Sequence, residues 1–217
     1  MADGLEAAGI RRVNISLDSL RADTYRLITG KDALPAVRRG IEVAVRRQRW
    51  HVCLNVVVMR GINQMELPAF ADLTRHLPLE VRFIELMPLQ DNVVRWQQLF
   101  VASRESRAML GEMEPLPGDG AAASRRYRLP HGGIIGFISP VSEPFCASCT
   151  RLRVTAGGML VPCLRAPGGI DLRSAMPRPD FDEWLAEICA QIGQEKLALA
   201  GLKRHPVPAE AMSYIGG

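Results

Sequence analysis

Three short apolar segments alternate with two helical patterns in the first 90 residues, and this alternation constrains the fold more than any other feature. The segments 12–17, 51–59 and 81–87 are rich in β-branched and apolar residues, which is typical of half-buried or buried strands. Apolar residues recurring every three or four positions predict helices over 33–49 and 65–77. Strand, helix and strand in succession predict an α/β fold with parallel βαβ units, whose ligands bind at the carboxyl ends of the strands.

Polar side chains occur near those strand ends. We expect Asp18 and Ser19 to cap a helix that follows the first strand. The candidates for a ligand site are the polar or sulfur-containing residues near the ends of the three strands, namely Ser16, Asp18, Asn55, Arg82, Glu85 and Met87. For each one alone, a satisfied polar group or a core side chain is the alternative interpretation.

The second half of the chain has a different character. Residues 111–123 are rich in Gly, Pro and Ala, which indicates a loop or a boundary. Two hairpins are predicted after it, one pairing 126–129 with 133–139 and one pairing 151–155 with 159–164, each around a glycine turn. A final amphipathic helix is predicted over 181–193.

Composition excludes several classes of protein. The 217 residues carry 27 Lys and Arg against 23 Asp and Glu, a net charge of +4 without a concentrated basic run, so we predict no nucleic-acid partner. No apolar stretch approaches the roughly 20 residues of a membrane-spanning helix, so no membrane partner is expected. The first residues lack the pattern of a secretory signal, and five cysteines are an odd number, so we expect a cytoplasmic protein whose cysteines are not paired as disulfides.

Three of these cysteines have the spacing of a metal site. Cys146 and Cys149 form a Cys-x-x-Cys pair, and the glycine turn of the second hairpin would fold Cys163 back beside them. An iron–sulfur cluster with three thiolates leaves one iron open to a substrate atom. Zinc, a redox pair and a thiol that only packs in the core are the alternatives. Arg151 and Arg153 are spaced to point to one side of a strand and to hold phosphate oxygens, or to line an exposed strand face.

With these residues in view, the chain resembles the GTP 3′,8-cyclase of molybdenum cofactor biosynthesis, the MoaA family of the radical S-adenosylmethionine superfamily. The resemblance covers the C-terminal two-thirds of such a protein. It depends on motifs that follow in family order along the whole chain, at residues 13–19 (VNISLDS), 55–58 (NVVV), 81–87 (VRFIELM), 145–153 (FCASCTRLR), 163–164 (CL) and 215–217 (IGG). The family fold that it implies is the second half of a partial (βα)6 barrel over residues 1–110, followed by a small α+β auxiliary iron–sulfur domain over residues 111–217.

The resemblance also implies roles for individual residues. An auxiliary [4Fe–4S] cluster would be held by Cys146, Cys149 and Cys163. The implied contacts of S-adenosylmethionine are Ser16 and Met87, with Arg82 beside them, and those of GTP are Arg151, Leu152 and Arg153. Gly216 and Gly217 resemble a mobile tail that enters the active site, so the implied catalytic set is Arg151, Arg153, Gly216 and Gly217. The implied reaction converts GTP to (8S)-3′,8-cyclo-7,8-dihydroguanosine 5′-triphosphate, with an electron donor as a further partner.

The sequence departs from the family pattern at two points. Cys53 stands where the family usually has a lysine that binds triphosphate, which removes one cationic contact. These 217 residues also hold no Cys-x-x-x-Cys-x-x-Cys segment for the second [4Fe–4S] cluster, the one that cleaves S-adenosylmethionine, so we expect them to be inactive alone. The rival hypotheses are another radical enzyme with an auxiliary cluster and a noncatalytic iron–sulfur or zinc-binding fragment. Open strand edges make a homodimer a further expectation.

Overall fold

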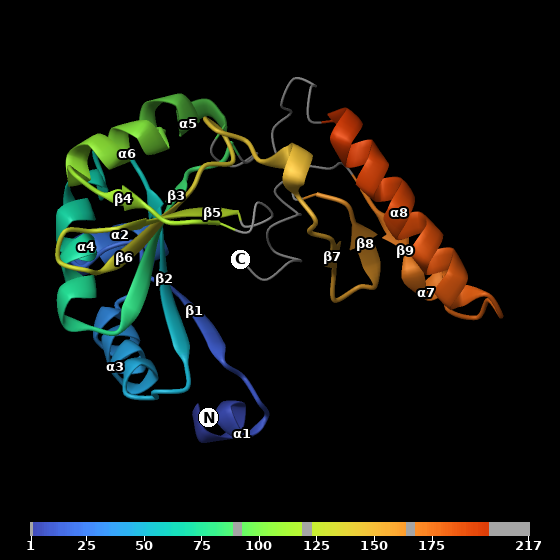
Figure 1. The fold of residues 1–217 in the computed structure, drawn as a ribbon, viewed down its shortest axis with the longest axis horizontal. Coiled ribbons are helices and arrows are strands. Elements are labelled where there is room, and N and C mark those ends of the chain that lie inside the picture. Colours follow the sequence, from blue (N-terminus) through green and yellow to red (C-terminus); the bar gives the residue numbers. More distant parts are fainter. Residues whose placement is uncertain (1, 89–92, 119–122, 164–167, 200–217) are drawn as a thin grey trace. The chain divides into compact units, whose positions relative to one another are not determined.

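The computed structural model describes residues 2–88, 93–118, 123–163 and 168–199 (Figure 1). The chain divides into two compact units. The first comprises residues 1–86 and 98–143, and the second comprises residues 87–97 and 144–217. Helix α5 (Val93–Leu99) contains the point at which the chain returns from the second unit to the first.

The first unit is built on one six-stranded sheet of order β1-β2-β3-β6-β5-β4. Strands β1, β2, β3 and β6 are parallel, while β5 and β4 pair antiparallel at one edge. Its strands are β1 (Arg12–Ser16), β2 (His51–Val58), β3 (Leu79–Glu85), β4 (Glu114–Pro115), β5 (Ser124–Arg128) and β6 (Ile134–Ile138). Its helices are α1 (Ala2–Ala7), α2 (Ala22–Thr29), α3 (Leu34–Val45), the short 3-10 helix η1 (Gln64–Glu66), α4 (Leu67–His76) and α6 (Ser103–Leu110).

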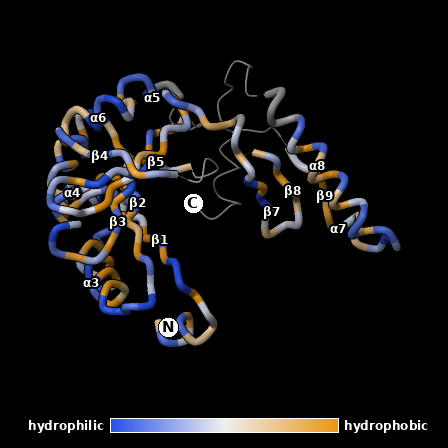
Figure 2. The backbone as a smooth tube through the Cα atoms, in the orientation of Figure 1, coloured by the Kyte–Doolittle hydropathy of each residue, from blue (hydrophilic) through white to orange (hydrophobic). Residues whose placement is uncertain are grey.

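The hydrophobic core lies between the helices and one face of this sheet. Strand residues at alternate positions, such as Val52, Leu54 and Val56 of β2, are fully buried on that face. They pack in one cluster with apolar residues of α2, α3 and α4, and the hydropathy colouring of Figure 2 shows the apolar run along β2. Because side chains alternate along a strand, the residues between them form the opposite face, which is largely polar.

Most predicted elements of this unit are confirmed. The three predicted strands and the parallel βαβ pairing are present, and the two predicted helices occur as α3 and as η1 followed by α4. The first hairpin also forms, with Gly132 in the left-handed region at its turn. Its second strand, β6, pairs with β3, so residues 124–138 extend the sheet of β1–β3 although they follow the Gly- and Pro-rich segment. The functional division that we predict at residue 110 stays a prediction.

One predicted detail is wrong. Asp18 and Ser19 do not cap the next helix, because α2 has Arg21 at its N-cap position and no side-chain capping bond. Both side chains make long-range contacts instead. The Asp18 carboxylate accepts from the Val57 amide at 2.7 Å, and the Ser19 hydroxyl donates to the Glu66 carboxylate at 2.8 Å.

The second unit contains a small three-stranded antiparallel sheet of order β7-β8-β9 and a long helix. Its elements besides α5 are the 3-10 helix η2 (Cys146–Ser148), β7 (Arg153–Val154), β8 (Met159–Val161), β9 (Ile170–Asp171), α7 (Leu172–Ala175) and α8 (Phe181–Leu199). The second predicted hairpin is therefore confirmed, and the final helix begins where predicted but runs six residues beyond Gly193, to Leu199. Across the described ranges, no helix combines the length and the apolarity needed to cross a membrane.

Candidate functional site

A row of polar side chains crosses the open face of the first sheet. Ser16, Asn55 and Arg82 are register partners on β1, β2 and β3, so they lie side by side on one face. The row continues to Gly136 of β6 and Arg126 of β5. A Cβ atom at position 136 would lie only 2.2 Å from the hydroxyl oxygen of Ser124. Glycine is therefore the residue that fits at this point of the row. Thus Ser16 and Arg82, two predicted cofactor residues, share this face with one residue between them.

Two polar atoms on this face are buried without a hydrogen bond in the part of the chain that the structure describes. They are Oδ1 of Asn55 and Oγ of Ser124. Buried polar atoms are nearly always paired in native proteins, with protein groups or with ordered water. The row therefore has unused hydrogen-bonding capacity at these two atoms.

Glu80 organises the charges beside this row. Its side chain is only 2% exposed, and its two carboxylate oxygens accept from Nε of Arg82 at 2.8 Å and from Nε of Arg126 at 3.0 Å. Arg82 also donates to Oδ1 of Asn14 at 3.3 Å, which fixes its guanidinium over β1. Sequence reasoning missed Glu80 because it placed the start of the strand at Val81.

His51 and Cys53 lie on the same face of β2. Burial raises the pKa of the Cys53 thiol, and burial likewise lowers the pKa of His51. Cys53 is fully buried, whereas the His51 side chain is 43% exposed. Both side chains are neutral in this environment at neutral pH.

Asp18, a predicted candidate, serves the structure of the loop after β1. Burial raises the pKa of its carboxyl, although the hydrogen bond from Val57 partly opposes that shift. Asn63 completes the arrangement, since its Nδ2 donates to the carbonyls of Asp18 at 2.6 Å and Val57 at 2.8 Å. These contacts tie the ends of β1 and β2 together.

Glu85, another candidate, points to the opposite face from Arg82 and binds backbone amides. Its carboxylate accepts from the amides of Ser103 at 2.8 Å and of Val141 and Ser142 at 2.9 Å, and also from the Ser142 hydroxyl. It is 2% exposed. Glu85 therefore joins the end of β3 to the start of α6 and to the loop after β6.

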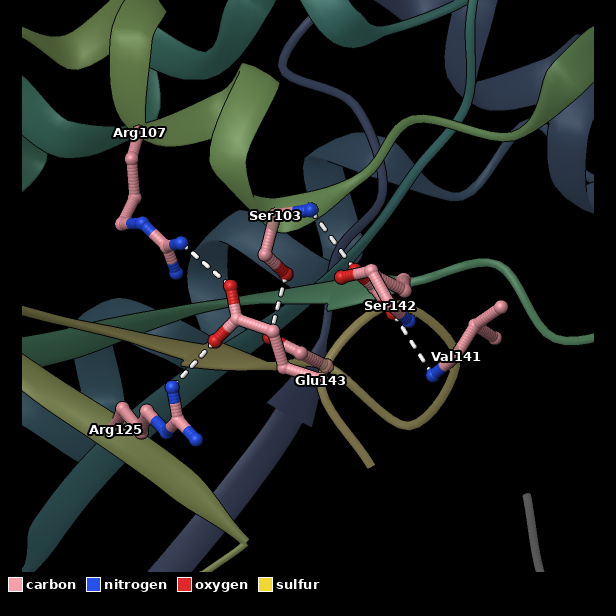
Figure 3. A network of polar contacts seen from close by, with 8 residues as sticks. Ser103, Arg107, Arg125, Val141, Ser142 and Glu143 are labelled. Carbon is pink, nitrogen blue, oxygen red and sulfur yellow. Dashed lines mark hydrogen bonds and ion pairs between the residues drawn. The ribbon is translucent and has the colours of Figure 1, made fainter. Parts of the chain in front are cut away.

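Glu143 closes the same loop from its other end. Figure 3 shows its carboxylate between Arg107 of α6 and Arg125 of β5, which donate to separate oxygens. Ser139 donates to the hydroxyl of Ser103 at 2.7 Å. Residues 139–143, which immediately precede the cysteine segment in the chain, are thus held by side chains from three elements of the first unit.

The Glu143 contacts predict a pH-dependent contribution to stability. The Arg107 guanidinium holds the pKa of Glu143 below its usual range, and Arg125 adds to that effect. A carboxyl with a lowered pKa in the folded state stabilises above its ordinary pKa and loses that contribution as the pH falls through the lowered value. We expect Glu143→Gln to lower the free energy of unfolding by about 1 kcal/mol at pH 7.

Urea unfolding of the two proteins at several pH values measures this effect. The difference should shrink as the pH is lowered from 6 to 3, because the wild-type carboxyl becomes protonated. Glu112→Gln, which changes an exposed glutamate of the same unit, is the control. A difference between wild type and Glu143→Gln that is constant over this range would contradict the assignment.

The three predicted cluster cysteines all belong to the second unit. Cys146 opens η2, the amide of Cys149 closes this turn by donating to the Cys146 carbonyl at 3.2 Å, and both residues are half-buried. Cys163 follows β8 by two residues and is also half-buried. Strand β8 pairs with β7, where Arg153 is the register partner of Val161. The hairpin therefore brings the Arg153 strand alongside the strand that leads to Cys163.

The remaining predicted residues have these places. Met87 lies just after β3, and Arg151 and Leu152 precede β7, with Arg151 exposed and Leu152 half-buried. Gly216 and Gly217 lie outside the described residues. Ser16 and Arg82 belong to the first unit, and Met87, Arg151 and Leu152 belong to the second.

Comparison with known protein families gives a match over more than half of the chain. Residues 79–199 match the family model described as Molybdenum Cofactor Synthesis C. The GTP 3′,8-cyclase of Alkaliphilus metalliredigens (strain QYMF) is 41% identical over 217 residues, covering 99% of this chain and 68% of the relative. The enzyme of that name from Heliobacterium modesticaldum is 42% identical over 193 residues, covering 86% and 59%.

A third relative, the GTP 3′,8-cyclase of Moorella thermoacetica (strain ATCC 39073 / JCM 9320), is 39% identical over 224 residues, covering 100% of this chain and 68% of the relative. The chain belongs to the GTP 3′,8-cyclase family of molybdenum cofactor synthesis. It spans 68% of the length of the relative at 41% identity and 59% of the length of the relative at 42% identity. The resemblance inferred from the sequence motifs is thereby confirmed.

Proposed function

We propose that this chain carries the part of a GTP 3′,8-cyclase that binds S-adenosylmethionine and GTP. The observation that carries the proposal is the row of Ser16, Asn55 and Arg82 on the open face of the sheet, with Oδ1 of Asn55 buried and unpaired among the described residues. An unpaired buried acceptor next to a hydroxyl and an oriented guanidinium suits a polar, charged small molecule. A relative that matches 99% of the chain bears the name of this activity.

We also propose how the sheet fits into the fold of the family. Strands β1, β2 and β3, with α2 to α4, would form the second half of a partial (βα)6 barrel within residues 1–110. The helices cover one face of the sheet, which supports this, because a barrel of this kind keeps its helices outside and its ligands inside. Residues 111–217 would comprise the auxiliary iron–sulfur domain.

The residues of the open face fit S-adenosylmethionine. The side-chain amide oxygen of Asn55, Oδ1, can accept from an ammonium or hydroxyl group, and Ser16 is exposed on β1. Glu80 and Asn14 hold Arg82 in one orientation. The remaining N–H groups of its guanidinium would donate to a carboxylate of the ligand. Met87, just after β3, is the fourth proposed contact. Bound S-adenosylmethionine would supply a radical that starts the rearrangement of GTP.

The cysteine segment fits an iron–sulfur cluster by the chemistry of its donors. Cys146, Cys149 and Cys163 supply three thiolates from one unit, which matches the ligands that such clusters use. Leu152 and the two arginines beside it, Arg151 and Arg153, would bind GTP, the guanidinium groups holding its phosphates. The Gly216-Gly217 tail would approach the reacting groups, where the absence of side chains lets the backbone pass.

An equilibrium dialysis experiment tests this proposal. After anaerobic reconstitution with iron and sulfide, the chain should bind radiolabelled GTP, and Arg153→Ala should weaken binding by about tenfold, the cost of one charge-assisted contact of about 1.5 kcal/mol. Arg178→Ala is the matched control, because Arg178 of the same unit pairs with Asp180 and stacks on Trp184. Equal GTP binding by all three proteins, or none by any, would refute the GTP site.

Turnover is a separate measurement. We expect no 5′-deoxyadenosine from the 217 residues alone with S-adenosylmethionine and an electron donor. A cytoplasmic location and assembly as a homodimer are proposed with this function. The rival, a noncatalytic zinc module, predicts bound metal without acid-labile sulfide and no GTP binding.

A further inference from the structure

Three side chains with different metal-binding atoms lie together on the polar face of the first sheet. His51 and Cys53 are two residues apart on β2, so both leave the same face of the strand. Glu80 of β3 is the register partner of Cys53. The imidazole nitrogen, the thiol sulfur and a carboxylate oxygen lie within 4.8 Å of one another. All three come from rigid strands of one unit.

The donor set and its spacing match a single metal ion. Zinc binds histidine nitrogen and carboxylate oxygen at about 2.0–2.2 Å and cysteine sulfur at about 2.3 Å, so tetrahedral ligand atoms are about 3.3–3.5 Å apart. Nε2 of His51 is already 3.6 Å from Oε2 of Glu80, and the other separations are at most 4.8 Å. Side-chain adjustments of about 1 Å therefore close the site. We propose that His51, Cys53 and Glu80 form a mononuclear binding site for Zn²⁺.

The arginines that hold Glu80 are the main competing influence. Arg82 and Arg126 each occupy one lone pair of the carboxylate, and each oxygen has a second lone pair. Ligating carboxylates in metal sites are commonly hydrogen-bonded in this way. The arginines therefore orient the ligand, and their charge limits the affinity of the ion.

Binding exchanges one Zn²⁺ ion for one proton at the site. Zn²⁺ replaces the proton of the Cys53 thiol, the proton goes to solvent, and no electron moves, so the local charge rises by one. Three protein ligands leave the fourth tetrahedral position to water. The His51 side chain is 43% exposed, which gives the ion and the water a path from solvent, while Cys53 and Glu80 form the buried side.

Cobalt titration tests this site apart from the cysteine segment. The probe is Co²⁺ added to the full chain with Cys146, Cys149 and Cys163 all changed to serine, and the expected result is a thiolate-to-cobalt charge-transfer band that Zn²⁺ displaces. His51→Ala in this background should weaken Co²⁺ binding by about tenfold or more, since losing even a hydrogen-bond partner of a ligand has an effect of that size. His76→Ala is the control, because His76 is also exposed and also lies beside a carboxylate.

Two results would overturn the proposal. One is the absence of a thiolate band in the serine background, and the other is a Co²⁺ affinity that His51→Ala leaves unchanged. Zinc calorimetry on the chain with all its cysteines provides a second measurement if the triple variant unfolds, because His51→Ala changes an exposed side chain and should remove one binding site. The serine background removes the proposed cluster ligands, so failure of the cluster and failure of this site are distinguishable.

Discussion

Glu85→Ala should lower the free energy of unfolding by at least about 3 kcal/mol, because three backbone amides lose their acceptor and each costs about 1–3 kcal/mol when buried unpaired. Those amides belong to Ser103, Val141 and Ser142. The cavity left by the carboxylate adds to the loss. The melting temperature should fall by roughly 6 °C or more. Urea unfolding followed by circular dichroism measures the free energy of unfolding, and thermal unfolding followed in the same way measures the melting temperature.

An isosteric variant and an exposed control should be measured beside Glu85→Ala. Glu85→Gln keeps the volume and one carbonyl acceptor but turns an amino group toward backbone donors, so it should lie between wild type and Glu85→Ala. Glu112→Ala changes an exposed glutamate and should stay within about 0.5 kcal/mol of wild type. A Glu85→Ala protein within 1 kcal/mol of wild type would show that the amides find other partners.

Cys163→Ser should abolish assembly of the proposed iron–sulfur cluster. Cluster irons are held by thiolates, and a serine hydroxyl at the end of the hairpin cannot replace the third one without ionising. After anaerobic reconstitution, iron and acid-labile sulfide should fall to background, with loss of the visible absorption of the cluster. GTP binding should fall with them, since a cluster held by three thiolates leaves one iron open to a substrate atom.

Cys189→Ser is the matched control for this change. Cys189 is a half-buried cysteine of the same unit, on α8, and it lies outside the proposed ligand set. Sulfide content should be unchanged in that variant. Retained sulfide in Cys163→Ser, or its loss in Cys189→Ser, would contradict the ligand assignment, and bound zinc without sulfide in the unaltered chain would favour the zinc hypothesis.

The parallel part of the fold was predictable because local pattern and burial agree there. The β-branched run at 51–59 is buried on both faces for much of its length, and apolar periodicity marks α3 and α4. The pairing of β6 with β3 was not predictable, because it joins residues some 50 positions apart. Short elements such as β9 and α7 carry too few residues for a periodic signal.

The candidate site was predictable in part. Ser16 and Arg82 lie on one row of the open face, as strand-end reasoning suggested, whereas Glu85 faces the other way. The two-residue period of a strand contained that information, since Arg82 and Glu85 are three residues apart. Glu80 was missed because the predicted strand began at Val81, and its contact with Arg126 forms only in the folded sheet. The cluster itself remains a prediction from cysteine spacing.

The two edges of the six-stranded sheet are unequal, and this has a consequence for how the sheet can grow. At one edge, β4 is two residues long and contains Pro115, which cannot donate a ladder hydrogen bond. At the other edge, β1 presents five residues without proline. Within the described residues, a further strand can therefore pair with the outer edge of β1, whereas β4 is too short and lacks a donor at Pro115. Sheet extension is directional, and amide hydrogen exchange should be fastest along the outer side of β1.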